Sequence, residues 1–357
     1  MKKTLVALSV AAFAASANAV TVLDAEGTKV DFEGSLRLIM EKTSAKTTKA
    51  NGTVSKKSNE SNLRNAGSRF GVKVKHQLGE DFYGLGRVEF RFDDTDSNDE
   101  FGSLYARRAY VGLGSKQFGE ITFGRQVSIA DDLSQTNDYE YGFIPKGKYA
   151  TKEGTQVVRY DYRGVEGLQV SADYYFNQDH DTKGNVLETA IKNAYGVGAL
   201  YNVGAADVRV AYGHTNYETG TAQKHRKDGY LASASYAFGD FTLIGDFGYA
   251  HEKKGVENAS PVKTDKFYVA PGFKYQVVPT SIVYGNYLYE RVKTKDTSKE
   301  KTHGFLLGVD YKFHKQVVAF VEGKVVQTKE YSKVNNGYNY GGKTTDKAIG
   351  VGMRVFW

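Results

Sequence analysis

The chain has 357 residues, no cysteine and a formal net charge of +7, which excludes disulfides, thiolate metal sites and thiol nucleophiles. Its mean hydropathy is polar, at −0.49, yet 26 Tyr and 20 Phe bring the aromatic content to 13%. Beyond the first 19 residues, no apolar run approaches the ~18 residues that a membrane helix requires. This mixture is typical of a membrane β-barrel, in which half of each strand is polar.

The N-terminus has the three parts of a secretory signal peptide. Lys2 and Lys3 form a basic start, residues 5–15 form a short apolar run, and Ala17-Asn18-Ala19 is a small-residue cleavage site. We therefore expect residues 1–19 to be a signal peptide and residues 20–357 to form the mature protein. Removal of the signal peptide would lower the net charge from +7 to +5, because it contains two lysines and no acidic residue.

The rest of the chain alternates between apolar and polar residues, the period of a strand with one apolar face. Phe70, Val72 and Val74, for example, are separated by Gly71 and Lys73. The same alternation recurs over residues 87–92, 168–177, 230–238, 305–313 and 348–357. Pro271 and Gly272 interrupt one such segment, around 264–276, and predict a bulge or an early strand end near Ala270.

The connections alternate in length. Short ones rich in Gly and acidic residues lie at 79–81, 164–167, 203–205, 239–240 and 314–315, as in tight hairpins. Long polar ones lie at 42–66, 93–103, 127–154, 178–190, 218–228, 253–263, 293–301 and 329–343. Eight long connections predict an all-β fold, a 16-stranded antiparallel transmembrane β-barrel with short periplasmic turns and long extracellular loops. Its last strand would pair with its first and leave no open edge in lipid.

Aromatic residues gather beside the short turns, where one interfacial girdle of a barrel in the outer membrane is expected. They are Phe82, Phe118, Tyr201, Phe238, Phe241, Tyr275, Phe313 and Trp357.

The strand alternation also predicts which charges face the lumen. If Leu36 and Phe70 face lipid, then Arg37 and Arg69 face inward, and Tyr160 outward places Arg159 inward. By the same argument, the side chains of Arg87, Glu89 and Arg91 face inward. An arginine facing lipid at mid-bilayer would cost about 2–4 kcal/mol, which favours the lumen for these side chains.

The strand that contains Arg107 and Arg108 is ambiguous. Tyr110 outward would place Arg107 inward, whereas a slip of one residue would place Arg108 there instead. Both assignments stay open from the sequence.

Several segments together resemble the Gram-negative general porins over nearly the whole mature chain. They are KVDFEGSLRL at 29–38, SRFGVK at 68–73, RRAYVGL at 107–113, FGRQ at 123–126 and VRYDY at 158–162. The resemblance implies a homotrimer in the cell outer membrane and passive diffusion of ions and small hydrophilic solutes, with no cofactor. The resemblance favours Arg107 over Arg108 as the arginine that faces the lumen. The family usually ends in Phe, whereas this chain ends in Trp357.

The resemblance also implies that the third long loop, about 127–154, folds into the lumen and narrows the pore. Glu140-Tyr141-Gly142 looks like the Glu-aromatic-Gly step of the family's constriction loop. The candidate constriction residues are acidic on the loop, at Asp131, Asp132, Asp138 and Glu140, and basic on the wall, at Arg37, Arg69, Arg107 and Arg159. Opposed charges of this kind would set a transverse field across the pore.

The main alternative is a substrate-specific channel on the same barrel. An enzyme would need a catalytic pair near a rim of the barrel; His214 and Asp228 fall in the right kind of place, but no nucleophile motif accompanies them. The seven histidines lack metal-ligand spacing. Lysine runs in the first and seventh loops leave two readings open: contact with outer-membrane lipids and lipopolysaccharide, or ordinary solvated loops. Nucleic-acid binding is excluded, because the basic residues are scattered and the protein is secreted.

Overall fold

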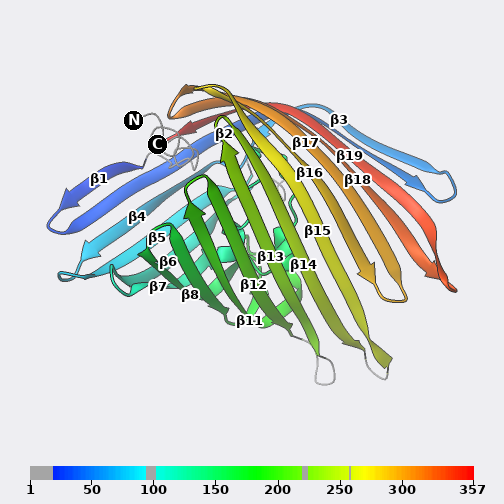
Figure 1. The fold of residues 1–357 in the computed structure, drawn as a ribbon, viewed down its shortest axis with the longest axis horizontal. Coiled ribbons are helices and arrows are strands. Elements are labelled where there is room, and N and C mark those ends of the chain that lie inside the picture. Colours follow the sequence, from blue (N-terminus) through cyan, green and yellow to red (C-terminus); the bar gives the residue numbers. More distant parts are fainter. Residues whose placement is uncertain (1–18, 94–101, 219–223, 257–258) are drawn as a thin grey trace.

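The computed structural model describes residues 19–93, 102–218, 224–256 and 259–357, which form a closed antiparallel β-barrel (Figure 1). Most of the predicted signal peptide and residues 94–101 of the second predicted loop lie outside these described residues. No helix in the described ranges is long and apolar enough to cross a membrane.

The barrel consists of 19 strand segments, with two short helices between β7 and β8. The segments are β1 (Val20–Ala25), β2 (Thr28–Lys49), β3 (Val54–Asn65), β4 (Arg69–Gln77), β5 (Phe82–Phe92), β6 (Leu104–Ser115), β7 (Gly119–Val127), η1 (Ile129–Asp132), α2 (Lys146–Tyr149), β8 (Glu153–Val165), β9 (Leu168–Tyr175), β10 (Gln178–His180), β11 (Val186–Val203), β12 (Ala206–Tyr217), β13 (His225–Phe238), β14 (Phe241–Val256), β15 (Ala259–Val278), β16 (Ser281–Thr294), β17 (Ser298–His314), β18 (Val317–Val334) and β19 (Gly337–Phe356).

These 19 segments make 16 strands, because three strands are each built from two segments. β3 and β4 pair with successive parts of β2, and β9 and β10 pair with successive parts of β11. β1 and β19 both pair with the same edge of β2. β1 pairs with the start of β2 and β19 with the part that follows, so the two segments form one strand of the barrel. The predicted fold class, a 16-stranded antiparallel barrel, is confirmed.

Closure between β2 and β19 uses the last residues of the chain. The register runs from Gly342 opposite Lys49 to Phe356 opposite Ser35. Beyond it, Trp357 and Gly34 exchange backbone hydrogen bonds of 3.1 and 2.9 Å. A Cβ on Gly34 would lie 2.5 Å from the Trp357 ring, so this glycine lets the indole lie flat across the seam. The terminal Trp is thus part of the closure.

The outer face carries the apolar row of each strand. On β19, Ile349, Val351, Met353 and Val355 are exposed, as an apolar band facing lipid requires. Six of the aromatic residues predicted beside the short turns are likewise exposed, at positions Phe82, Phe118, Tyr201, Phe238, Tyr275 and Phe313.

Two predictions about the strands are wrong. Much of the predicted loops 42–66, 293–301 and 329–343 is strand, because the hairpins β2–β3, β16–β17 and β18–β19 continue to short turns at 50–53, 295–297 and 335–336. β15 also continues through Pro271 without a bulge, since Val269 pairs with Tyr289 and Gly272 with Asn286 in one register. Between Thr264 and Gln276, the ladder to β16 lacks only the pairs at Ala270 and Pro271, where proline has no N–H to donate.

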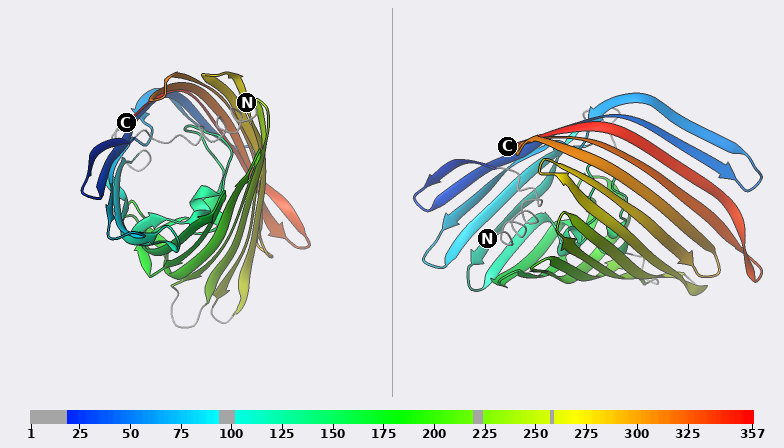
Figure 2. Two further views of the ribbon diagram at one scale, coloured as in Figure 1. Left: turned by 60° about the vertical axis from the view of Figure 1, so that its left-hand side comes forward. Right: turned by 45° about the horizontal axis from the view of Figure 1, so that its top comes forward.

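The segment between β7 and β8, residues 128–152, lies inside the ring of strands (Figure 2). We call it the inner loop. Its apolar side chains form the core of the molecule together with the inner wall of the barrel. Ile129, Leu133 and Tyr149 are buried against β12–β16, and Tyr141 is buried against β2 and β16–β19. At Gly229 the loop touches the strand backbone, because a Cβ there would lie 1.9 Å from the Tyr149 carbonyl oxygen.

Candidate functional site

Buried carboxylates on the inner wall hold the inner loop in the lumen. The carboxylate of Glu322 on β18 accepts the backbone N–H groups of Tyr139, Glu140 and Tyr141 at 2.7, 2.9 and 2.5 Å. Tyr284 donates its hydroxyl to the same carboxylate at 2.8 Å. Glu322 is 0% exposed, so these donors take the place of water around a buried charge.

Two further carboxylates fix the rest of the loop. Asp246 on β14 accepts the hydroxyls of Ser134 and Thr136 at 2.6 and 3.2 Å. Glu290 on β16 accepts the Tyr149 hydroxyl at 3.1 Å. The loop is therefore attached at its start, its middle and its end.

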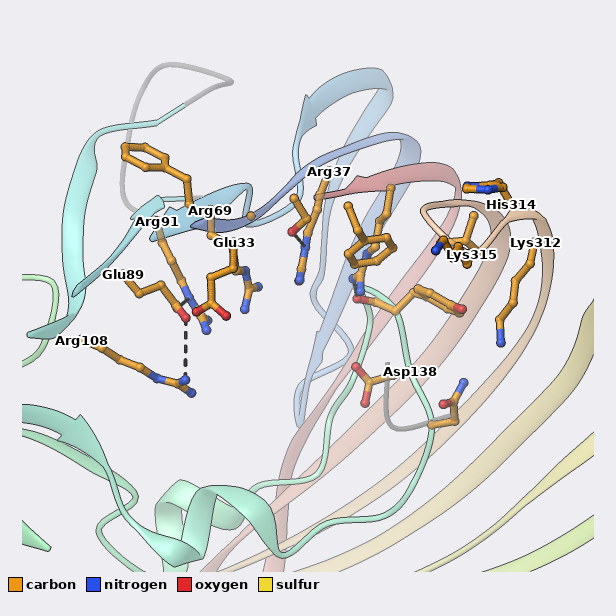
Figure 3. Close-up of a pocket in the computed structure, with 18 of the residues that line it drawn as sticks. Glu33, Arg37, Arg69, Glu89, Arg91, Arg108, Asp138, Lys312, His314 and Lys315 are labelled. Carbon is orange, nitrogen blue, oxygen red and sulfur yellow. Dashed lines mark hydrogen bonds and ion pairs between the residues drawn. The ribbon is translucent and has the colours of Figure 1, made fainter. Parts of the chain in front are cut away.

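A dense group of cations lies on the wall of β2–β6 and β19, facing the Asn137–Tyr139 segment of the loop across a pocket (Figure 3). We call it the arginine wall. Its members are Arg37, Arg69, Arg87, Arg91, Arg108 and Arg354. With Lys312 and Lys315, eight cations line this pocket against the three carboxylates of Glu33, Glu89 and Asp138. The pocket therefore has a large positive excess.

The arginine wall contains two kinds of arginine. Glu89 pairs with Arg87 at 3.0 Å, Arg91 at 2.6 Å and Arg108 at 3.7 Å. Arg37 and Arg69 instead bond neutral oxygens, the Ser35 hydroxyl at 2.7 Å and the Gly67 carbonyl at 3.2 Å. Within the described ranges neither has a carboxylate inside 4.0 Å, so both guanidinium charges remain available to solutes in the lumen.

The structure separates Arg107 from Arg108. Glu89 faces Arg108 across the ladder and Phe90 faces Ala106, so Arg107 is the extra residue of a β-bulge. Arg108 belongs to the arginine wall, whereas Arg107 pairs with Glu153 at the end of the inner loop. Of the two assignments left open by the sequence, the one with Tyr110 outward is wrong, since Tyr110 lines an inner pocket with Arg108. A bulge has no simple signal in an alternating sequence.

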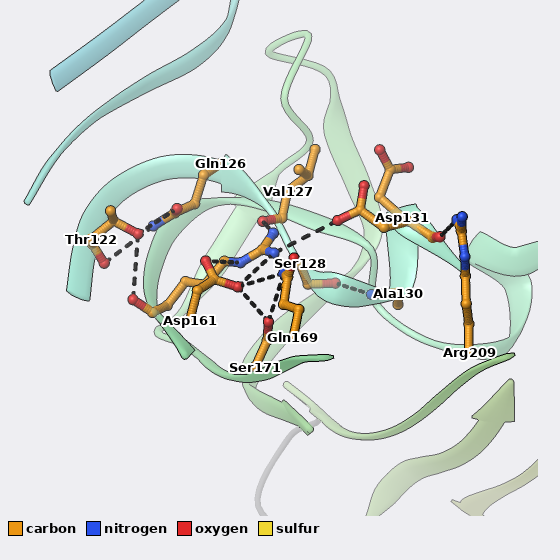
Figure 4. Close-up of polar contacts among 12 residues, drawn as sticks. Thr122, Gln126, Val127, Ser128, Ala130, Asp131, Asp161, Gln169, Ser171 and Arg209 are labelled. Carbon is orange, nitrogen blue, oxygen red and sulfur yellow. Dashed lines mark hydrogen bonds and ion pairs between the residues drawn. The ribbon is translucent and has the colours of Figure 1, made fainter. Parts of the chain in front are cut away.

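A separate polar cluster lies at the start of the inner loop, around Val127 and Asp161 (Figure 4), and Arg159 binds both of these residues. Its guanidinium binds Asp161 through two bonds of 2.9 Å and the Val127 carbonyl at 2.9 Å. Asp132 lies 3.6 Å from it. Arg87 and Arg108 line the pocket that this cluster shares with the arginine wall. Arg159 is thus held by its neighbours more tightly than Arg37 or Arg69.

The four predicted acidic residues of the loop each have different charged neighbours. Asp131 lies 3.8 Å from Lys146 and 3.9 Å from Lys152. Burial opposes ionisation there, but these lysines outweigh it and lower the pKa of Asp131. Burial raises the pKa of Asp132 against the opposing effect of Arg159.

Asp138 and Glu140 lie in different pockets. Asp138 faces the pocket of the arginine wall, where burial and the nearby Glu322 raise its pKa to about 6. Glu140 pairs instead with Arg64 at 2.8 Å, in a second pocket with Glu41 and Lys324. Arg64 was not predicted as a site residue; it follows Leu63, which is exposed on the outer face, so alternation places Arg64 inward.

The proposed catalytic pair lies on the outside of the barrel. Nδ1 of His214 is 2.7 Å from Asp228, which also accepts the Tyr212 hydroxyl at 2.8 Å. All three share the outward face of exposed Val210 and Tyr230. Across the ranges that the structure covers, no cluster of three or more His, Asp or Glu side chains is arranged to hold a metal ion.

Comparison with known proteins identifies the barrel. The family model described as Gram-negative porin matches residues 4–331. A major outer membrane protein of Pasteurella multocida (strain Pm70) is 30% identical, with 99% of each chain covered. Another Pasteurella multocida protein of that description is 29% identical over 99% of both chains.

Solved structures share the fold at lower identity. OmpT, an outer membrane protein of Vibrio cholerae, matches with a TM-score of 0.66 and 21% identity, covering 95% of this chain and 100% of that one. The anion-selective porin from Comamonas acidovorans matches with a TM-score of 0.62 and 18% identity, covering 92% and 100%. The chain therefore belongs to the family of Gram-negative porins and is a channel protein of the outer membrane.

Proposed function

We propose that the protein is a general diffusion porin that passes ions and small hydrophilic solutes and favours anions. The observation that carries the proposal is the arginine wall, which faces the inner loop and contains two guanidinium groups, those of Arg37 and Arg69, that have no carboxylate partner among the described residues. Fixed cations in a narrow aqueous path concentrate anions and repel cations. The solved relative from Comamonas acidovorans is described as anion-selective.

The inner loop supplies the second side of the proposed constriction. Of its predicted acidic residues, Asp138 faces the arginine wall, while Asp132 faces Arg159. Glu140 pairs with Arg64 in a second pocket that Glu41 and Lys324 also line, so charged groups of both signs lie there as well. In this arrangement polar solutes align in the transverse field, and apolar solutes must displace ordered water.

We also propose that the protein works as a homotrimer in contact with outer-membrane lipids. The support is the sequence resemblance and a related solved structure, OmpT of Vibrio cholerae, described in a trimer form. Light scattering of the detergent-solubilised protein, corrected for bound detergent, would test the proposal. A mass of three chains is the expected result, and a mass of one chain would contradict it.

The proposed transport is tested by reconstitution of the purified protein into planar bilayers and liposomes. We expect stepwise ohmic conductance in KCl, and swelling rates of liposomes that fall smoothly with the size of neutral sugars. Block of the current by micromolar amounts of one solute would favour a substrate-specific channel. Absence of conductance would contradict both the general diffusion porin and the substrate-specific channel.

A further inference from the structure

A second charged pocket lies in the lumen on the long-loop side of the inner loop. It is formed by β2, β3, β18 and β19 together with the inner loop, and we call it the vestibule pocket. Charged side chains from the wall and the loop line it, among them Glu41, Lys57, Arg64, Glu140, Lys324 and Asp346. Along β19, Asp346 precedes Arg354 of the arginine wall by eight residues, a rise of about 27 Å along the strand. A solute that enters from the long-loop side therefore meets the vestibule pocket first.

The part of the vestibule pocket next to the inner loop is neutralised within the protein. Arg64 lies between two carboxylates, with hydrogen bonds of 2.8 and 3.1 Å to Glu41 and a contact of 2.8 Å to Glu140. Glu41 also accepts the hydroxyl of Tyr141 at 2.7 Å. These groups satisfy one another, so a solute would have to break existing ion pairs in order to bind them.

Two charges of opposite sign lie side by side on the wall of the vestibule pocket. Lys57 on β3 and Asp346 on β19 are both directly opposite Ala45 of β2, which separates them. Ala45 belongs to the inward-facing row of β2 that also contains Arg37 and Glu41. Both charged residues therefore face the lumen. Neighbouring strands lie about 4.8 Å apart, so the backbones of Lys57 and Asp346 are about 10 Å apart.

These two charges have no partner in the part of the chain that the structure describes. There, no carboxylate lies within 4.0 Å of the Lys57 ammonium, and no basic group lies within 4.0 Å of the Asp346 carboxylate. Lys324 on β18 adds a second cation, with its ammonium 5.4 Å from the centre of the Tyr141 ring and no carboxylate within 4.0 Å. The vestibule pocket thus offers one unpaired carboxylate beside two unpaired ammonium groups.

We propose that the vestibule pocket binds zwitterionic solutes, namely amino acids and short peptides, before they reach the arginine wall. The ammonium group of the solute binds Asp346, and its carboxylate binds Lys57 or Lys324. A zwitterion forms charge-assisted contacts with both kinds of group at once, whereas a simple anion or cation leaves one kind unpaired. The small side chain of Ala45 leaves room between them for the body of the solute. The inference rests on the proposed channel function and adds a class of solute without net charge, which the arginine wall does not attract.

The test compares two double variants that each remove one positive and one negative charge. K57Q/D346N removes the two opposite charges beside Ala45. The control K56Q/D296N removes Lys56, which adjoins Lys57 on the other face of β3, and Asp296 at the exposed turn between β16 and β17. The measurement is the uptake of labelled glycylglycine into proteoliposomes over a range of concentrations. An uncharged solute of similar size, N-acetylglycylglycine amide, is measured in parallel.

We expect glycylglycine uptake by the wild type and by the control variant to saturate in the same way. In K57Q/D346N, uptake at low concentration should fall by about threefold to tenfold, since each solvent-exposed ion pair contributes up to about fivefold in affinity. The uncharged amide should enter equally through all three proteins, which shows that each variant is folded and open. Because K57Q/D346N keeps the net charge of the lumen, its chloride-to-potassium permeability ratio should stay at the wild-type value.

Equal glycylglycine uptake by the three proteins would overturn the inference. So would a loss of uptake in the single variant K57Q that D346N does not share, because the pocket would then recognise only the carboxylate of the solute. Failure of the proposed channel function gives a different result, in which the wild type passes neither glycylglycine nor the uncharged amide.

Discussion

The backbone N–H of Glu140 donates to the carboxylate of Glu322 at 2.9 Å, although the two residues are 182 positions apart in the chain. This contact belongs to a set of three consecutive N–H groups that surround one buried charge. These hydrogen bonds hold the inner loop so that its Asn137–Tyr139 segment faces the arginine wall. The width and charge of the proposed constriction therefore depend on a residue that does not line the pocket of that wall.

Replacing Glu322 should loosen the inner loop without unfolding the barrel. In E322Q, three N–H donors share one neutral amide oxygen, and the amide N–H₂ group meets other donors. Loss of hydrogen bonds to a buried charge costs about 1.5–3 kcal/mol. We expect a fall of this size in the free energy of unfolding, measured in urea with lipid vesicles, together with noisier open-channel current. E330Q, at an exposed position of the same strand, is the control, and equal behaviour of the two variants would refute the anchoring role.

Arg37 and Arg69 should carry much of the anion preference. Their guanidinium groups bond only neutral oxygens among the described residues, so R37Q/R69Q removes two uncompensated charges from the lumen. We expect the anion-to-cation permeability ratio to fall by roughly twofold or more at low salt, and by less in 1 M salt, where the Debye length is about 3 Å. The single variant R226Q loses an arginine on the outer face and should leave the ratio unchanged. A ratio that stays at the wild-type value in R37Q/R69Q would rule out this role.

Asp138 should make selectivity depend on pH. Its pKa is raised to about 6 by burial, with Glu322 adding to the effect, so it is mostly ionised at pH 7 and mostly protonated at pH 5. Protonation removes a negative charge opposite the arginine wall, and anion preference should rise on acidification. Because the folded-state pKa lies above the ordinary value of 3.8, the contribution of this residue to stability also rises as the pH falls. Reversal potentials of D138N should lack the step near pH 6; a wild-type pH profile in D138N would assign the step to another group.

Gly229 tests the close contact between loop and wall. A Cβ at this position would lie 1.9 Å from the carbonyl oxygen of Tyr149, so G229V must displace the end of the inner loop. Overpacking of this kind costs about 1–3 kcal/mol, and we expect a changed single-channel conductance as well. A Cβ added at Gly245, on the neighbouring strand, would have no other atom within 4 Å, and G245V is the control. Identical conductance of G229V and wild type would show that the loop end does not shape the path.

Alternation along the chain was enough to predict the barrel and most of its inward charges. The high cost of an arginine in lipid makes Arg37 and Arg69 face inward whatever the details of the fold. Alternation could not decide the faces of the strand from Arg107 to Tyr110, because the bulge at Arg107 shifts them by one residue. It also failed at Pro271, where a single register continues on both sides of the proline.

The contacts of the inner loop were beyond sequence reasoning for a different reason. Glu322 looks like any other inward charge in an alternating strand, and nothing local shows that it meets the backbone of residues 139–141. Glu140 was predicted to face the arginine wall through resemblance, whereas the structure pairs it with Arg64. Where a loop folds within a barrel is decided by packing between distant segments, such as Tyr149 against Gly229.

The most direct test of the central claim is the zero-current potential of the wild-type channel across a bilayer that separates two KCl concentrations. An arginine wall facing an anchored inner loop predicts that chloride is more permeable than potassium. The dilute side should then become negative relative to the concentrated side. A potential of the opposite sign would show that the carboxylates of the lumen dominate the path, and would contradict the account.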